Sequence, residues 1–232
     1  MKLKRWEDLP EYMQVPEVRP YYDLLKKKQF SLLNKQIFDF VTAGILLVLL
    51  AVPMTAIAVW IKTDSPGPVM YRQERVTTYG KHFMIHKFRT MVKNAEELGA
   101  SVTSFDDERI TKVGRKLRHL RLDELPQLFD VLQGNMSFVG TRPEAVEYVE
   151  RYAPEYYATL LMPAGITSKA SILYKDEEKL LRDADDVDEM YLTQILPEKM
   201  RWNLKAIRDF SIKQDLVTMF QTVGAVLRKE QS

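Results

Sequence analysis

The sequence contains no cysteine and only three histidines among its 232 residues. Without cysteine, a disulfide scaffold, a thiol nucleophile and a thiolate metal site are all excluded. His82, His86 and His119 form no metal signature, because His82 and His86 would share one face of a strand with no third ligand apparent. No GxSxG, Walker or dinucleotide glycine pattern is present either, so a serine-type hydrolase is not expected.

The sequence also lacks a marked excess of positive or negative charge. The chain has 34 Lys and Arg against 32 Asp and Glu, a formal net charge of +2. This balance gives no case for a nucleic-acid partner, and none is expected. The length corresponds to one domain with appendages, or at most to two small domains.

Charged residues are missing altogether between Phe40 and Ile61. A helix of about 20 residues is ~30 Å long and can cross the apolar layer of a bilayer, whereas buried apolar runs in soluble proteins are usually about 10–14 residues long. The run begins too far from Met1 and lacks the small-residue cleavage site of a signal peptide. The pattern therefore predicts a membrane helix.

Pro53 lies inside this run, removes an N–H and clashes with the carbonyl of Leu49, which predicts a kink or break. A single span would carry one basic flank outside, against the positive-inside bias. We therefore predict a re-entrant helix over 35–62, with both ends on the cytoplasmic side; a kinked single span is the alternative. The basic residues are Lys26, Lys27, Lys28 and Lys35 before the run, and Lys62, Arg72, Arg75 and Lys81 after it.

The predicted fold class is α+β: a mostly helical, membrane-associated domain with a small β-hairpin, mounted on the N-terminal Pro-broken helix. Residues 1–34 form an amphipathic segment that lies at the membrane interface or packs on the domain. Residues 63–150 are expected to form the catalytic core, and 151–232 the C-terminal helical part of the same domain.

Turn signals and periodicity divide the chain further. Strands are expected at Val69–Gln73 and Phe83–Phe88, joined through Tyr79-Gly80, and Phe138–Pro143 is expected to be a loop. An acidic stretch at Lys175–Glu189 is expected to form a solvated face, since it lacks calcium-loop spacing. Helices are predicted at Val113–Leu120, Pro126–Gly134, 144–162 and 198–229, the last with an apolar stripe that packs on the domain or, as a minority interpretation, contacts the interface.

Two adjacent carboxylates, Asp123 and Glu124, stand just before Pro126. If Pro126 begins a helix, both lie at its positive end, which favours the ionised forms. An ionised Asp at such a place can bind Mg²⁺ or attack phosphorus as a nucleophile. Acidic residues are also common there simply as helix caps.

Cations surround this pair in the sequence and strengthen the chemical interpretation. Arginine suits bidentate phosphate recognition, and phosphoryl transfer depends mainly on positioning and charge neutralisation. Beside a membrane segment, this combination suggests transfer of a phosphate-bearing group to or from a lipid. A basic patch that binds anionic lipid headgroups is the alternative. The cations are Arg115, Lys116, Arg118, Arg121, Lys87, Arg89 and Arg142.

Five ordered motifs then resemble one family, the bacterial sugar transferases, also called monotopic phosphoglycosyl transferases or polyprenyl-phosphate glycosylphosphotransferases. The resemblance runs from about Lys35 to Pro143. The motifs are Ser65-Pro66-Gly67-Pro68 with Gln73 and Arg75, Lys87-Phe88-Arg89-Thr90-Met91, Arg109-Ile110-Thr111 with Gly114-Arg115, Leu122-Asp123-Glu124-Leu125-Pro126-Gln127-Leu128, and Met136-Ser137-Phe138-Val139-Gly140-Thr141-Arg142-Pro143.

The resemblance implies a re-entrant helix and a two-step transfer of a sugar-1-phosphate from a UDP-sugar to polyprenyl (undecaprenyl) phosphate, with release of UMP. Asp123 would be the nucleophile and a Mg²⁺ ligand, and Glu124 would act as base or orienter. The substrate-binding residues implied are Arg118, Arg142, Lys87, Arg89 and Gln127.

The resemblance also implies an enzyme on the cytoplasmic face of the inner membrane that begins surface-polysaccharide assembly. Its partners would be membrane lipid and downstream glycosyltransferases, and a homodimer with a second copy of the chain is one of the states that the resemblance allows. A catalytically silent membrane scaffold and a diphosphate hydrolase are the alternatives.

The sequence departs from the family pattern at several positions. Gln36 replaces an Arg, Val52 a Ser before Pro53, and Thr77 a glycine. Further on, Thr141 replaces a proline, Ala164 is an extra residue, and Ser168 replaces a glycine. Because such loops can shape the donor pocket, the identity of the sugar does not follow from the resemblance.

Overall fold

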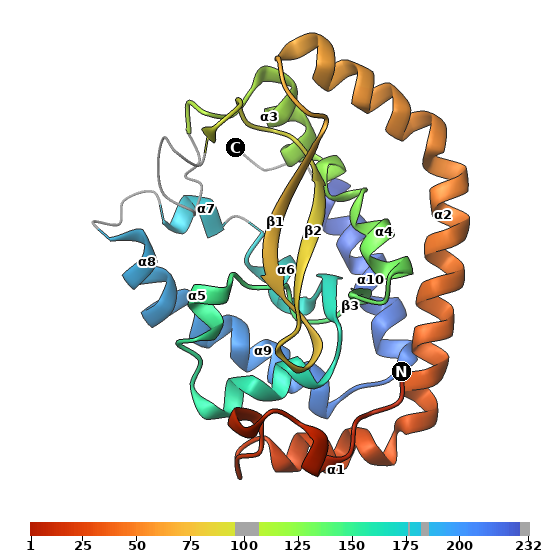
Figure 1. Ribbon diagram of the computed structural model, residues 1–232, viewed down its shortest axis with the longest axis vertical. Helices are drawn as coiled ribbons and strands as arrows, with labels where there is room; N and C mark the ends of the chain where they lie inside the picture. Colours follow the sequence, from red (N-terminus) through yellow and green to blue (C-terminus); the bar gives the residue numbers. More distant parts are fainter. Residues whose placement is uncertain (96–106, 176, 182–185, 228–232) are drawn as a thin grey trace.

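The long helix α2 (Gln29–Asp64) arcs along one side of the molecule, and the rest of the chain packs into its concave side (Figure 1). The structure is a computed structural model that describes residues 1–95, 107–175, 177–181 and 186–227. The inner face of α2 is buried at positions spread along its whole length, including Leu32, Ala43, Met54 and Ile61. The helix therefore forms one wall of the hydrophobic core and is not a detached stalk.

The helix runs through Pro53 without the predicted break, and it curves along its length (Figure 1). Leu50 and Ile57 pack against the globular part on either side of the proline, and these contacts hold the two halves together. Thr55 Oγ1 donates a hydrogen bond to the Ala51 carbonyl (2.8 Å), a back-bond that favours bending. The helix also begins earlier than the predicted range of 35–62.

The N-terminal segment packs on the domain, which is the second of its two predicted alternatives. Its elements are η1 (Trp6–Asp8), η2 (Glu11–Met13) and α1 (Arg19–Lys27). Met13, Tyr22 and Leu25 are buried in a core shared with the C-terminal helices. Apolar burial, which contributes about 25 cal/mol per Å², accounts for this docking.

The predicted β-hairpin is confirmed, with strands longer than expected. β1 (Met70–Val76) pairs antiparallel with β2 (His82–Phe88), and Gln73 lies opposite Ile85. The connection η3 (Thr78–Gly80) turns through Tyr79 (φ 57°) and Gly80 (φ 75°). Such positive φ values are the turn chemistry that the Tyr79-Gly80 pair indicates.

The two short helices around the carboxylate pair are also confirmed. α3 (Lys112–His119) is capped by the Thr111 side chain, and α4 (Gln127–Leu132) follows Pro126. Between them, η5 (Leu122–Glu124) forms a single 3₁₀ turn. Gly134 (φ 73°) ends the helical segment as predicted.

A second small sheet was not predicted. β3 (Met136–Val139) pairs in parallel with β4 (Ala164–Thr167), so the predicted loop at Phe138–Pro143 is wrong for its first two residues. All four β3 residues are buried, so the strand shows no polar–apolar alternation.

The single helix predicted over 144–162 is also wrong. It is split into α5 (Val146–Val149) and η6 (Pro154–Leu161). Pro154 forces Ala153 into an extended conformation (ψ 150°), which separates the two elements.

The C-terminal part is helical as predicted, but its long stripe is divided. The chain turns at Asp209–Ser211; α9 packs inward, whereas α10 leaves Phe220, Val223 and Leu227 exposed. The elements are α6 (Lys169–Leu173), α7 (Glu177–Leu180), α8 (Val187–Met190), the π-turn η7 (Tyr191–Ile195), α9 (Leu196–Arg208) and α10 (Ile212–Leu227).

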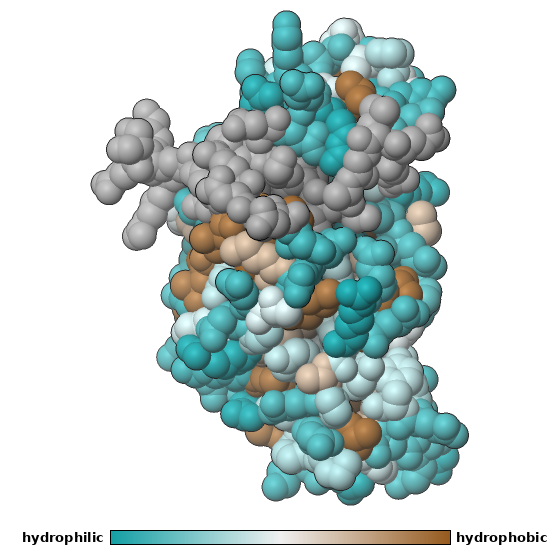
Figure 2. Space-filling view, turned by 90° about the vertical axis from the view of Figure 1, so that its left-hand side faces the viewer, coloured by the Kyte–Doolittle hydropathy of each residue, from teal (hydrophilic) through white to brown (hydrophobic). Residues whose placement is uncertain are grey.

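The acidic stretch is solvated as predicted where the structure describes it, since Asp186, Asp188 and Glu189 are exposed and Glu177 is half-buried, while residues 176 and 182–185 lie outside the described residues. Glu177 accepts from the buried Lys199 (3.0 Å), and Asp188 accepts from the Tyr148 hydroxyl (2.6 Å). The face of the molecule away from α2 is mostly hydrophilic, with scattered apolar residues (Figure 2). The predicted mostly helical α+β architecture therefore holds, with one small sheet more than predicted.

Candidate active site

The carboxylate pair lies in the turn between α3 and α4. Arg121 adopts the left-handed conformation (φ 53°) and redirects the chain into η5, which carries Asp123 and Glu124. Only 9% of Asp123 and 8% of Glu124 is exposed. Burial of two adjacent carboxylates is costly unless cations compensate, so their surroundings decide their protonation.

Glu124 is held by arginines from two segments. Its Oε1 atom lies 2.8 Å from Arg142 Nη2 and 3.5 Å from Arg121 Nη1. Burial raises the pKa of Glu124, but the charges of Arg142, Arg121 and Lys87 outweigh burial and lower this pKa to about 2. Glu124 is therefore ionised, and its salt bridge fixes the loop that carries Arg142.

Asp123 is arranged differently. Within the described part of the chain, its carboxylate has no hydrogen-bond or salt-bridge partner. Burial and the neighbouring Glu124 raise its pKa, while Lys87, Arg118 and Arg121 act in the opposite direction. A desolvated carboxylate without hydrogen bonds is a stronger nucleophile than one that is salt-bridged, so the two neighbours are suited to different roles.

Lys87 on β2 contributes an adjustable charge. Burial and the nearby Arg142 lower the pKa of Lys87 to about 8, although both carboxylates act to raise it. Arg75 on β1 lies in the same electrostatic environment, and burial lowers its pKa as well. The hairpin thus brings the charge of Lys87 to both carboxylates.

Arg118 and Arg89 have separate partners. Arg118 Nε donates to Thr90 Oγ1 (2.9 Å), while its charge acts on Asp123. The Arg89 guanidinium donates to Ser65 O (2.7 Å), Ser65 Oγ (2.9 Å) and Pro66 O (3.0 Å). Arg89 therefore fixes the loop that follows α2, and its guanidinium is directed to that loop.

Gln127 lies one helical turn beyond Asp123 and is 1% exposed. Neither its amide oxygen nor its amide nitrogen has a hydrogen-bond partner in the described residues. Buried polar atoms are nearly always paired, so an unpaired amide at this position is consistent with a ligand that supplies the partners.

The structure thus groups Asp123, Glu124, Arg118, Arg142 and Lys87 in one electrostatic cluster, with Gln127 close in the chain. Pro53 lies apart, on the exposed surface of α2. The contact between Arg118 and Thr90 was not predicted from the sequence. The two are 28 residues apart, and no local pattern indicates such a contact.

Metal ligation can be tested against this geometry. Among the described residues, no group of three or more His, Asp or Glu side chains is placed to hold a metal. Mg²⁺ is often held by one or two carboxylates together with substrate phosphates. The unpaired Asp123 carboxylate fits that mode, whereas the nearer oxygen of Glu124 is occupied by arginines.

A buried carboxylate pair under converging cations, beside a helix long and apolar enough to cross a membrane, is typical of a membrane-associated protein that handles anionic ligands. The family model of the bacterial sugar transferases matches residues 30–229. This chain belongs to the bacterial sugar transferase family.

Several curated relatives align with most of this chain. A UDP-N-acetylgalactosamine-undecaprenyl-phosphate N-acetylgalactosaminephosphotransferase of Aeromonas hydrophila is 38% identical over 85% of this chain and 46% of its own length. UDP-glucose:undecaprenyl-phosphate glucose-1-phosphate transferases of Escherichia coli (strain K12) and Caulobacter vibrioides are 35% and 33% identical, over 93% and 86% of this chain. The chain spans 44% of the E. coli protein and 72% of the Caulobacter protein.

Proposed function

We propose that this chain is a phosphoglycosyl transferase that moves a sugar-1-phosphate from a UDP-sugar to polyprenyl phosphate, such as undecaprenyl phosphate, and releases UMP. The observation that carries the proposal is the unpaired, buried Asp123 carboxylate among cations. The names of the relatives supply the substrate classes.

In the first step, an Asp123 carboxylate oxygen attacks the β-phosphorus of the UDP-sugar. A carboxylate–phosphorus bond forms, the bond from that phosphorus to the bridging oxygen breaks, and UMP leaves with the electron pair. In the second step, a polyprenyl phosphate oxygen attacks the same phosphorus, and Asp123 returns as a free carboxylate. Covalent catalysis lets one site serve two bulky anionic substrates in turn.

The other residues hold and neutralise phosphate in this scheme. Arg118 and Lys87 offset the negative charge of the diphosphate, while Arg142 and Glu124 fix each other and orient the site. The Gln127 amide would donate to and accept from the bound substrate. Asp123 would also hold Mg²⁺ against the diphosphate, where the ion would neutralise charge on the leaving phosphate.

Replacement of the nucleophile tests the proposal. Asp123→Asn should release no UMP from UDP-sugar and should retain no label from a sugar donor radiolabelled in its β-phosphate. Asp23→Asn, which changes an exposed aspartate of α1, is the matched control and should behave as the unchanged protein. Full turnover by Asp123→Asn would refute the covalent mechanism, and intact UDP-sugar with every donor would refute the activity.

We also propose that α2 enters and leaves the membrane on the cytoplasmic side of the inner membrane. Both ends of the helix are tied to the same globular body: Lys35 pairs with Asp215 (2.6 Å), and Asp64 Oδ2 accepts from the Val113 amide (3.1 Å). A straight span would have to separate one end from these partners. In that position the enzyme would catalyse the first membrane step of surface-glycan assembly and supply downstream glycosyltransferases.

The topology can be tested without removal of native thiols, because the sequence has no cysteine. Phe30→Cys and Lys62→Cys place single thiols on exposed positions at the two ends of α2. An impermeant reagent should label neither thiol in intact cells and both in inverted vesicles. Labelling of one position from outside would establish a single span.

A further inference from the structure

α3 presents one face made of cations. Lys112, Arg115, Lys116 and His119 follow the i, i+3, i+4, i+7 spacing and are exposed, while Val113, Gly114 and Leu117 on the opposite face are buried. Among the described residues, Lys112 and Arg115 have no ion-pair partner. Of the two η5 carboxylates, Glu124 is paired with Arg142 and Arg121, and no ion pair joins Asp123 to this face, so the face is not neutralised within the described residues.

The basic residues on this face are not needed to form or dock α3. Lys112 is the first residue of α3, where the positive end of the helix dipole disfavours a cation. Thr111 already caps the helix by accepting from the Gly114 amide (2.9 Å). Gly114 packs so closely on the segment that follows β2 that an added Cβ would lie 2.0 Å from the Thr90 carbonyl oxygen, so burial of the opposite face is what docks α3.

The cationic face adjoins the C-terminal end of the membrane helix. α3 packs beside the last turns of α2 (Figure 1), where the Val113 amide donates to Asp64 (3.1 Å). Lys116 Nζ lies 5.5 Å from the centre of the Trp60 ring, and Trp60 is 41% exposed. Tryptophan gathers at the boundary between apolar chains and headgroups, so Trp60 marks the level of the interface.

We infer that α3 is a docking face for anionic phospholipid headgroups, held at the membrane surface beside the end of α2. Lys112, Arg115 and Lys116 would contact the headgroup phosphates, with Lys62 and Trp60 at the same level on α2. The inference rests on the membrane association of α2 and is independent of the transfer reaction. Charge complementarity favours anionic lipids as the ligand of this face. The anionic lipids of the cytoplasmic leaflet attract clusters of Lys and Arg, whereas neutral lipids do not.

Trp60 supplies the probe for a direct test. Trp6→Phe with Trp202→Phe leaves Trp60 as the single tryptophan of the full chain. The protein is reconstituted in phosphatidylcholine that contains a small share of either brominated phosphatidylglycerol or brominated phosphatidylcholine, and quenching of Trp60 is compared. Brominated phosphatidylglycerol should quench more strongly, and added salt should weaken the difference.

The variant Lys112→Gln, Arg115→Gln, Lys116→Gln should lose this preference. The enrichment of phosphatidylglycerol near Trp60 should fall at least fivefold, the loss expected from one cation near an anionic surface, about 1 kcal/mol. The matched control is Arg151→Gln, Arg201→Gln, Lys205→Gln, which removes three exposed cations near α5 and on α9, away from α3 (Figure 1). The control should keep the full preference.

A charge-retaining variant separates binding from folding. Lys112→Arg with Lys116→Arg should keep the preference for phosphatidylglycerol. Equal quenching by the two brominated lipids in the unchanged protein would overturn the inference, as would a preference that survives in the glutamine variant. Loss of the preference on addition of one equivalent of polyprenyl phosphate would assign the face to the substrate and would also overturn it.

Discussion

At the scale of single residues, the site depends on how charges are divided between two neighbouring carboxylates. Glu124 is paired with Arg142, whereas Asp123 is left without a partner among the described residues. The sequence predicted both carboxylates and both cations at Arg118 and Arg142, because their types and order are informative. The division of roles was not predictable, since it depends on a contact between Glu124 and a loop 18 residues away.

The pairing of Glu124 predicts an acid-sensitive stability. The pKa of Glu124 is about 2 in the folded protein and near its ordinary 4.5 when unfolded. The ionised Glu124 therefore contributes about 3 kcal/mol to the free energy of unfolding. This contribution is complete above pH ~4.5 and is lost as pH falls towards ~2. In Arg142→Met, the midpoint of thermal unfolding in detergent should depend less on pH across this window. Arg201→Met, which removes an exposed pair with Glu198, is the control and should retain the dependence.

The pKa of Lys87 predicts that substrate binding weakens at basic pH, which would appear as a basic limb in the pH profile of KM. Its pKa is about 8, so its charge is present below that pH and is lost as pH rises through it. The KM for UDP-sugar should increase above pH ~8 because the diphosphate loses a countercharge. In Lys87→Arg the limb should move to higher pH, since arginine stays charged. An unchanged limb in that variant would show that another group titrates.

At the scale of elements, local patterns predicted the hairpin and the short helices α3 and α4. Turns at Gly80 and Gly134 depend on the glycines themselves, so the predicted ends of these elements lie close to the observed ones. β3 and β4 were missed because four fully buried or nearly buried residues show no alternation, and their pairing joins segments far apart in the chain. The overlong helix at 144–162 arose because apolar content outweighed the signal of Pro154.

Two glycine substitutions should change stability in opposite directions, one in the sheet of β3 and β4 and one in α10. A Cβ on Gly165 would lie 2.1 Å from the Gly140 backbone nitrogen, so Gly165→Ala should destabilise the fold by about 2 kcal/mol. Gly224 lies in the exposed part of α10 with no atom within 4 Å of an added Cβ, so Gly224→Ala should stabilise its helix by up to about 1 kcal/mol. Unfolding midpoints in detergent should therefore move in opposite directions.

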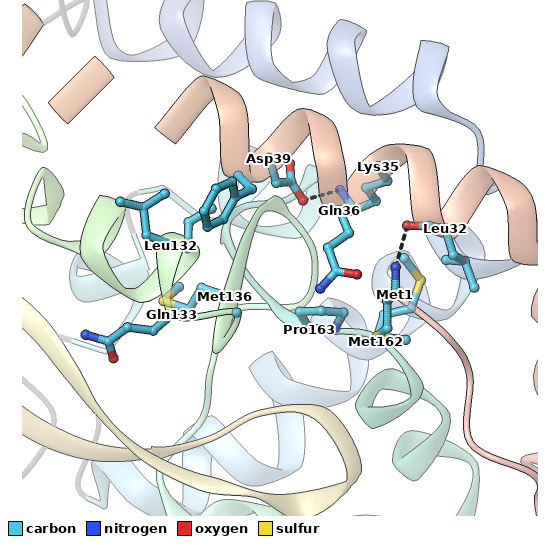
Figure 3. Close-up of a pocket in the computed structure, with 13 residues that line it drawn as sticks. Met1, Leu32, Lys35, Gln36, Asp39, Leu132, Gln133, Met136, Met162 and Pro163 are labelled. Carbon is cyan, nitrogen blue, oxygen red and sulfur yellow. Dashed lines mark hydrogen bonds and ion pairs between the residues drawn. The ribbon is translucent and has the colours of Figure 1, made fainter. Parts of the chain in front are cut away.

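At the scale of the whole molecule, buried charges join α2 to the C-terminal helices. Lys35 of α2 pairs with Asp215 of α10 (2.6 Å) and lies 3.7 Å from Asp39, which in turn accepts from Ser137 Oγ of β3 (2.7 Å). Lys35 and Asp39 line a cavity of about 240 Å³ together with Gln36, Leu132 and Pro163 (Figure 3). No local pattern predicted the link, because it spans 180 residues.

Removal of the central cation should release α10. Lys35→Met leaves the buried Asp39 and the partly buried Asp215 without their countercharge, and breaking a buried pair costs about 3–5 kcal/mol. Hydrogen exchange should accelerate across α10 while α9, which is buried on its own core, remains protected. Lys213→Met changes an exposed cation of α10 and should leave the exchange unaltered. Uniform acceleration in both helices would indicate global unfolding instead.

The concave face of α2 has a practical consequence for handling the protein. Because Ala43, Met54 and Ile61 complete the cores around α4 and α3, the membrane helix is part of the folding unit. A chain cut to begin after Asp64 would expose those cores to water and should aggregate, so no detergent-free fragment is expected. Purification must carry the lipid-facing helix along with the globular part.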